Sequence, residues 1–310
     1  MLRSGEKQKD SEAGIKEVKS IKFGLFNPKE IEEMAVCKIS LDEGGNENSG
    51  NINDLKMGPI DYDIYNKAKC STCNCDLYEC PGHFGYIHLE KPVFHVGYIK
   101  ECANLLNSIC SNCGEILIDN YEQYEQINKI KDPKVRQSKI YNLCKNILFC
   151  NERIPKNGNL TNKEKKNSKF YKKGCQTEQI KYKVDNLKII KKDQKSNKDN
   201  TTELKIISPE EVIKIFDKIA DKNLELLGFN LTFINPKSMI IQNLAVCPPQ
   251  IRPSVSFSSL ISQDDLTLQY NQILNANSKL KKEIDKGATL TTIQSNFDIL
   301  QANVAGLINN

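Results

Sequence analysis

Helical spacing of apolar residues is the clearest pattern in the chain, and it is most regular near the C-terminal end. Leu266 and Tyr270 begin one apolar stripe, Ile293 and Phe297 begin another, and Gly287 lies between them. Residues three and four positions apart lie on one face of an α-helix. The pattern predicts two long helices joined by a short turn. An antiparallel hairpin and two ordinary core helices fit it equally well.

Shorter elements are predicted upstream of these helices. Residues 21–26 alternate between apolar and polar, which predicts a short strand, and a short helix is expected over 29–35. Helical spacing returns over 121–144, with a break at Asp132 and Pro133. The mixture of short strands and helices indicates an α+β fold.

A further helix start is encoded near residue 208. Ser208 can cap the helix, Pro209 suits its first position, and Glu211 completes a capping box. Downstream, Pro248 and Pro253 are incompatible with a regular helix, so an extended passage is expected there.

The composition describes a polar chain with a limited hydrophobic core. Only 39% of its 310 residues are hydrophobic, Trp is absent, and the mean hydropathy is −0.51. One large domain or two to three small ones fit this length, and long stretches must be solvated or covered by partners. No run of about 18 apolar residues occurs, so no membrane span is expected. Residues 1–16 are polar and charged, which indicates a disordered lead-in without a secretory signal.

The positive charge of the chain is concentrated in one segment. The net charge is +5, but residues 163–205 contain 14 lysines against six acidic residues. This segment could meet phosphate groups through its charge. A solvated loop is the commoner explanation for such a segment, because aromatic residues are sparse in it.

Twelve cysteines are expected to be reduced, which favours metal binding over disulfides. Cys70, Cys73, Cys80 and His83 follow a C-x2-C-x6-C-x2-H spacing. Three thiolates and one imidazole suit tetrahedral Zn²⁺, and four protein ligands leave no open position, so the site is predicted to be structural. Chance spacing or a pair of disulfides is the alternative. Cys75 is the spare sulfur, because its use would break the paired spacing.

Cys110 and Cys113 form a second, incomplete half-site. Cys144, Cys150 and Cys175 are its candidate partners, and spacing does not choose among them. His88 and His95 lie on alternating segments and are interpreted as packed or surface residues. No catalytic constellation is recognisable, and the adjacent Asp264 and Asp265 are interpreted as a helix cap and a first-turn acid.

The segment from Cys70 to Ile99, CSTCNCDLYECPGHFGYIHLEKPVFHVGYI, resembles the zinc-bearing clamp segment of the largest subunit of eukaryotic nuclear RNA polymerases. Further motifs resemble this family in the same order, over residues 21–310: IKFGLFNPKEI, ICSNCGEILID, IYNLCKNILFC, KKGC, SPEEVIKIF, LGFN, PKSMII, PPQIRPSVSF and DDLTLQYNQIL. The polymerase II subunit is the best match among the three nuclear enzymes, and the polymerase III subunit is the runner-up.

The resemblance implies a complete second zinc site. Motif by motif, its ligands fall on Cys110, Cys113, Cys150 and Cys175, with Cys144 as a packed residue and residues 151–174 as an excursion pinned at its ends. Two positions depart from the family pattern but are not ligands. Tyr86 stands where a His is common, and Gln176 stands where a Gly is expected.

The resemblance also implies an architecture. The expected units are a lead-in (1–16), an N-terminal clamp region with the first zinc site (17–119), the second zinc site with Lys/Asn-rich loops (120–205), a clamp core with a lid-like segment (206–263) and a coiled-coil hairpin (264–310). The fold class is therefore an irregular α+β clamp module stabilised by zinc, followed by a long antiparallel helical hairpin.

By the same resemblance, the chain is expected to be the N-terminal part of a nuclear DNA-directed RNA polymerase subunit, holding two structural Zn²⁺ ions. The expected partners are other polymerase subunits, template DNA, the RNA–DNA hybrid, and initiation and elongation factors at the hairpin. The catalytic Mg²⁺ is expected outside this chain. Arg252 is predicted to contact a phosphate, with a salt bridge inside the clamp as the alternative. A free-standing zinc module that binds nucleic acid is the rival function.

Overall fold

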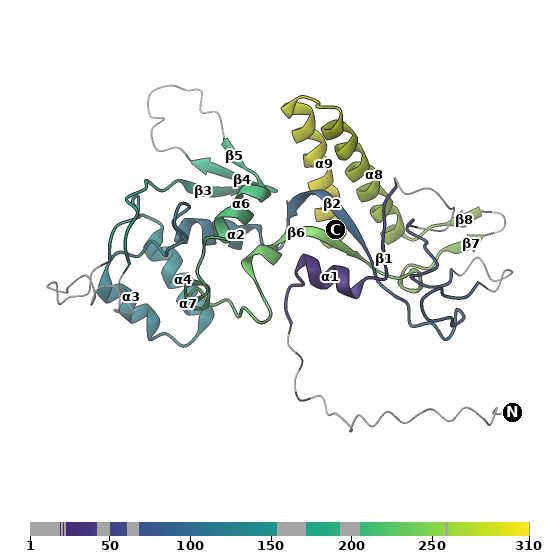
Figure 1. The fold of residues 1–310 in the computed structure, drawn as a ribbon, viewed down its shortest axis with the longest axis horizontal. Helices are drawn as coiled ribbons and strands as arrows, with labels where there is room; N and C mark the ends of the chain where they lie inside the picture. Colours follow the sequence, from purple (N-terminus) through teal and green to yellow (C-terminus); the bar gives the residue numbers. More distant parts are fainter. Residues whose placement is uncertain are drawn as a thin grey trace.

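The computed structural model describes residues 19, 21, 23–41, 50–60, 68–153, 172–192, 205–257 and 260–309. Helices and short strands are mixed along the described chain, as the sequence predicts, and the strands form small sheets (Figure 1). The helices are α1 (Pro28–Met34), α2 (Ile99–Ser108), α3 (Tyr121–Asn128), α4 (Pro133–Cys144), α6 (Pro209–Phe216), α7 (Asp221–Leu226), α8 (Asp265–Asp285) and α9 (Leu290–Ile308), with short 3-10 turns η2 (Pro236–Met239) and η3 (Pro249–Ile251). The strands are β1 (Cys37–Lys38), β2 (Gly85–Phe94), β3 (Lys181–Asp185), β4 (Lys188–Lys192), β5 (Lys205–Ile207), β6 (Ile240–Val246), β7 (Val255–Phe257) and β8 (Leu260–Ser262).

A three-stranded sheet in the order β1-β2-β6 connects the two halves of the molecule. β1 is parallel to β2, and β2 is antiparallel to β6. The register shifts between His88 and Val93. Phe94 and Ile240, which pair at one end of the sheet, belong to a different hydrophobic core from Val93. The sheet therefore joins two cores.

The first core surrounds α2, against which α4 and β3 pack. β3, β4 and β5 form an antiparallel sheet beside it. The largest fully buried side chains of this core are aliphatic: Ile109, Ile116, Leu117, Ile118, Ile127, Ile140, Ile189, Ile207 and Leu227. Cys110, Cys144 and Cys150 belong to the same core.

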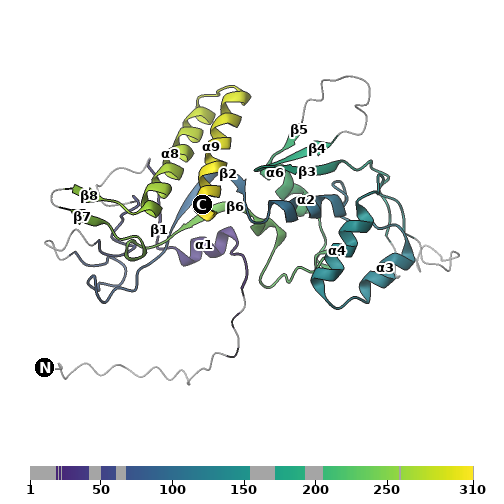
Figure 2. The same cartoon turned by 180° about the vertical axis from the view of Figure 1, so that it is seen from behind.

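The second core lies where α8 and α9 pack on β2 and β6. The two helices lie side by side in both views, joined by a turn in which Gly287 has a φ of +67° (Figures 1 and 2). Asp264 caps α8 by accepting from the Leu266 N–H at 2.8 Å, as predicted. Gln301 of α9 bonds both the N–H and the carbonyl of Phe94 at 2.8 Å, which fixes the hairpin to the central sheet.

Other helices also begin with side-chain caps, including the one at Asp132 and Pro133, where the sequence predicts a break in the helical spacing. Asn27 forms a capping box at α1, and Asp132 accepts from the backbone at the start of α4. Ser208 accepts from the Glu211 N–H at 3.2 Å, but the Glu211 carboxylate bonds Nζ of Lys191 at 3.0 Å. The capping box predicted there is therefore only half formed, because the Glu211 carboxylate binds the ammonium group of Lys191 in β4.

The strand predicted over residues 21–26 is wrong for the residues described there. The Leu25 N–H donates to the Phe233 carbonyl at 3.2 Å, but this single bond belongs to no ladder. Ile21 and Phe23 are 77% and 91% exposed, so the alternation does not mark one buried face. A strand needs a neighbouring strand as well as an alternating pattern.

The predicted lead-in over residues 1–16 lies outside the described residues, as does most of the Lys/Asn-rich sequence over 154–171 and 193–204. In the described part of the chain, no helix combines the length and apolar character that crossing a membrane requires.

Candidate metal centres

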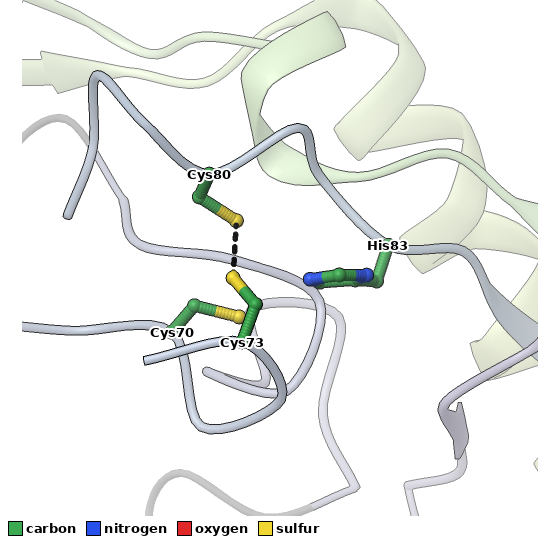
Figure 3. Close-up of side chains that lie close together, drawn as sticks. All are labelled: Cys70, Cys73, Cys80 and His83. Atoms are coloured by element: carbon green, nitrogen blue, oxygen red, sulfur yellow. Dashed lines mark hydrogen bonds between the residues drawn. The ribbon is translucent and has the colours of Figure 1, made fainter. Parts of the chain in front are cut away.

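The first cluster consists of Cys70, Cys73, Cys80 and His83, whose candidate ligand atoms all lie within 4.8 Å of one another. Figure 3 shows the three sulfurs turned toward a common point, with the imidazole ring of His83 extending toward them. The sulfurs of Cys73 and Cys80 are 3.6 Å apart. All twelve cysteines are free thiols, so the disulfide alternative does not describe this cluster.

Tight turns bring these side chains together. The Asn74 N–H donates to the Cys70 carbonyl at 2.9 Å, and the Cys70 N–H donates to the Cys75 carbonyl at 3.0 Å. Asn74 has a φ of 58° and Gly82 a φ of +79°, the left-handed conformation that Asn and Gly tolerate best. A Cβ at Gly82 would lie 2.7 Å from Cγ of Pro248, so only glycine fits this turn.

The polar environment of the first cluster fits a cation. The Thr72 and Gly82 N–H groups point at the sulfurs of Cys70 and Cys80, each at 3.4 Å. Nε2 of His83 is buried and has no hydrogen-bond partner. A buried nitrogen without a partner is costly, and a metal ion among the sulfurs would supply one.

Burial and the neighbouring imidazole affect the thiols of the first cluster in opposite directions. Desolvation raises the pKa of Cys80 to about 12. The imidazole of His83 lowers the pKa of Cys73 to about 6. Since zinc takes thiolates, its binding would displace the proton that burial holds on Cys80.

The second cluster consists of Cys110, Cys113, Cys150 and Cys175, again with all candidate ligand atoms within 4.8 Å. The Cys110 and Cys175 sulfurs are 3.4 Å apart, and those of Cys113 and Cys150 are 3.7 Å apart. The structure thus brings together the four cysteines that the family resemblance selects.

The first pair of this cluster lies on a turn that follows α2. The Cys110 N–H donates to the Glu115 carbonyl at 2.8 Å, and the Gly114 N–H donates to the Cys110 carbonyl at 2.9 Å. Gly114 has a φ of +71°, and a Cβ there would lie 2.2 Å from the Lys218 carbonyl oxygen. The turn requires glycine because the backbone after α6 packs directly against it.

The second pair is held by two chain segments that run past each other. The Cys150 N–H donates to the Thr177 carbonyl at 3.1 Å, and the Gln176 N–H donates to the Cys150 carbonyl at 3.0 Å. Beyond them, Arg153 and Lys172 form an antiparallel backbone bridge. The two described ends of the 151–174 excursion are therefore paired.

Polar groups also surround the second set of sulfurs. Nε2 of Gln179 lies 3.2 Å from the Cys110 sulfur, and the Thr177 hydroxyl lies 3.2 Å from the Cys175 sulfur. Burial opposes ionisation of Cys175, but hydrogen bonds from Thr177, Cys110 and Cys113 together lower the pKa of that thiol to about 6. Desolvation raises the pKa values of Cys113 and Cys150.

The remaining candidate ligands lie elsewhere. Cys144 is buried in the first core, and burial raises the pKa of its thiol to about 12. The Cys75 sulfur lies 3.5 Å from the Cys73 carbonyl and is not part of the cluster. His88 bonds Asn243 at 2.8 Å, and His95 packs edge-on against a tyrosine ring. His88 is exposed and His95 is half-buried, which agrees with the interpretation of both as packed or surface residues.

Arg252, which the sequence analysis predicts to contact a phosphate, is 4% exposed. Its Nε donates to the Cys247 carbonyl at 3.0 Å, and Nη2 donates to the Ile52 carbonyl. Nη1 donates to Asn53 Oδ1 and Thr267 Oγ1, both at 3.2 Å. All of these acceptors are neutral, so none of these contacts is a salt bridge. The phosphate contact of Arg252 therefore stays a prediction.

Sequence reasoning missed several residues around the second cluster. Gln179, Lys172 and Arg153 are buried although their residue types are usually exposed. They stand in a polar stretch whose pattern gives no sign of burial.

Comparison with known proteins gives two findings. The family model described as RNA polymerase Rpb1, domain 1, matches residues 15–310. The chain is also similar to a protein of Euplotoides octocarinatus named DNA-directed RNA polymerase II subunit RPB1. The two are 37% identical over 311 aligned residues, which cover 97% of this chain and 61% of the relative. The chain thus spans about three fifths of the length of the relative it matches.

Proposed function

Because this chain belongs to the RNA polymerase Rpb1 domain 1 family, we propose that it forms the N-terminal clamp region of the largest subunit of DNA-directed RNA polymerase II. The observation that carries the proposal is the match over residues 15–310, together with 37% identity to an RPB1 protein. A likeness that extends through both cysteine clusters and the helical hairpin favours this role over a free-standing zinc module.

In this proposal each cysteine cluster holds one structural Zn²⁺. Cys70, Cys73, Cys80 and His83 hold the first ion. The second is held by Cys110, Cys113, Cys150 and Cys175. Zinc supplies no redox chemistry here, and four protein ligands leave no position for substrate. The buried, unpartnered Nε2 of His83 and the converging sulfurs support this assignment.

The proposed mechanical role follows from where the clusters lie. The second cluster shares buried residues with the first core, and the helical hairpin shares the second core with the central sheet. Zinc ions would stiffen the clamp region so that it moves as a rigid body over template DNA and the RNA–DNA hybrid. The hairpin of α8 and α9 would be the docking site for initiation and elongation factors.

The chain would contribute no catalytic group of its own. Nucleotidyl transfer would use Mg²⁺ bound by other parts of the polymerase, and the chain would act in the nucleus with other polymerase subunits. The five units expected from the sequence, with the hairpin over 264–310 as the last, are proposed as the organisation of this clamp.

The test is purification of the epitope-tagged chain from its own cells, followed by mass spectrometry and zinc analysis. We expect other RNA polymerase II subunits to copurify, and two zinc ions per chain. Recovery of polymerase III subunits would reassign the enzyme. Recovery of no polymerase subunit, with the chain absent from transcribed chromatin, would overturn the proposal.

A further inference from the structure

We propose that Lys172 and Gln179 neutralise the second metal centre, so that this centre keeps its ion through buried positive charge as well as through its four sulfurs. This inference rests on the proposed zinc binding. Lys172 acts through space on the thiolates, and Gln179 acts through an N–H···S hydrogen bond. Both are positioning residues rather than ligands.

The need for neutralisation follows from the donor set. Four thiolates around one divalent ion leave a net charge of minus two in formal terms, whereas three thiolates and one imidazole leave only minus one. Cys110 and Cys150 are fully buried, so much of the larger charge would lie in a region of low dielectric constant. A buried charge is tolerated when opposite charge or hydrogen-bond donors lie beside it.

Lys172 brings the opposite charge. It is 2% exposed, and its Nζ donates to the Ile116 carbonyl at 3.0 Å. Among the described residues, no carboxylate forms an ion pair with this ammonium. Ile116 forms a backbone bridge with Ile109, the residue before Cys110, so this ammonium lies against the turn that carries the first pair of cysteines. A buried ammonium near buried sulfurs is costly beside thiols and favourable beside thiolates.

The backbone fixes where this charge lies. The Arg153 N–H donates to the Lys172 carbonyl at 2.9 Å, and the Lys172 N–H returns the bond at 3.3 Å. Arg153 is itself buried, with Nη1 on the Ile118 carbonyl at 2.7 Å and its guanidinium over the ring of Tyr124. The two segments leading from Cys150 and toward Cys175 therefore each carry a buried cation.

Gln179 brings a directed donor. It is 3% exposed, and its Nε2 lies 3.2 Å from the Cys110 sulfur and 2.7 Å from the Thr177 carbonyl. Its Oε1 accepts from the Ser111 N–H at 3.3 Å. Because these bonds fix which end of the amide carries the donors, the N–H group faces the sulfur. The lysines nearest the first cluster in sequence, Lys56 and Lys69, are exposed and supply no comparable buried charge.

The experiment compares Lys172→Met with Lys173→Met in the zinc-loaded 310-residue chain. Lys173 is the adjacent, exposed lysine, so the control changes the same net charge. Zinc loss under a competing chelator is followed by alkylation of the released thiols and peptide mapping, which separates the two clusters. Loss of a residue that supports a metal ligand from outside typically weakens metal affinity by about 10–100-fold.

We expect Lys172→Met to speed alkylation of Cys110, Cys113, Cys150 and Cys175 by about tenfold or more, while the first cluster stays at the wild-type rate. Lys173→Met should match wild type at both clusters. Lys172→Arg, which keeps the charge, should restore slow release. Gln179→Met should speed release at the second cluster alone.

A second readout separates this role from ordinary packing. Without metal, Lys172→Met is expected to change the melting temperature by less than it does with zinc, because the full negative charge of the four-thiolate centre is absent. With zinc, the same variant should melt below wild type. Equal destabilisation in both states, or faster release at both clusters, would overturn the inference. A wild-type chain that binds no zinc at the second cluster would instead overturn the proposed function.

Discussion

The two cysteine clusters gather the same number of donor groups by different routes. Cys70 and His83 mark the ends of one short loop, whereas Cys110 and Cys175 lie at opposite ends of a stretch that includes α3 and α4. The first cluster lies outside both hydrophobic cores, while Cys110 and Cys150 are buried within the first core. A local cluster can form before the surrounding protein folds. The second cluster needs α2 and the segments around Cys150 and Cys175 to be in place.

This difference predicts different consequences of losing each ion. Apparent binding free energies for structural zinc are roughly 10–16 kcal/mol, and whole domains are stable by roughly 5–15 kcal/mol. Cys150→Ser should therefore unfold much of the first core, with hydrogen exchange increasing across α2, α4 and β3. Cys73→Ser should release zinc but increase exchange mainly over residues 68–84. Hydrogen exchange with mass spectrometry measures both.

Cys144→Ala is the control for Cys150→Ser. Cys144 is a buried cysteine of the same core but is not in the cluster, so the variant should keep both zinc ions and lose only about 1–2 kcal/mol. If Cys73→Ser and Cys150→Ser gave the same exchange pattern, the two clusters would not differ in their coupling to the core.

Arg252 tests the same difference at the first cluster, because its guanidinium bonds the segment that supports this cluster. The Ile52 carbonyl and Asn53 accept from its guanidinium, and Met57, a few residues on, accepts from the His83 N–H at 2.9 Å. Arg252→Ala leaves buried acceptors without donors, so we expect a loss of roughly 3 kcal/mol in unfolding free energy. Urea denaturation at fixed free zinc measures it, and zinc release should quicken at the first cluster only.

Arg136 provides a matched control for Arg252. Its guanidinium also donates to backbone carbonyls, those of Ile130, Glu225 and Leu226, but it lies on α4 and contacts α7. Arg136→Ala should destabilise the chain without affecting zinc release at the first cluster. If Arg252→Ala left stability unchanged and weakened DNA binding by the chain, the phosphate contact predicted from the sequence would be supported.

The first cluster is more predictable from the sequence than the second, because its ligands lie close together along the chain. The four residues of the first cluster are recognisable because their spacing encodes two tight turns. Hydrogen bonds between near neighbours in the sequence close these turns. The second set was open among Cys144, Cys150 and Cys175 until family likeness chose between them. Lys172 and Gln179 were missed because their burial depends on a backbone bridge to Arg153 that no local pattern records. The strand over residues 21–26 failed for the same reason, since alternation does not reveal whether a partner strand exists.

The smallest expected effect concerns backbone strain beside each cluster. Asn74 and Gln176 are both exposed, with φ values of 58° and 59°. Asn adopts this left-handed conformation readily, whereas for a residue such as Gln it costs about 1 kcal/mol. Gln176→Gly should therefore raise the unfolding free energy of the zinc-loaded chain, and with it the denaturation midpoint. The expected gain is about 0.5 kcal/mol, because glycine is more flexible in the unfolded state and this offsets part of the relieved strain. Asn74→Gly should leave the midpoint unchanged or slightly lowered. Equal shifts at both positions would mean that the second cluster does not hold Gln176 in a strained conformation. The Gly that the family pattern places at this position would then need another explanation.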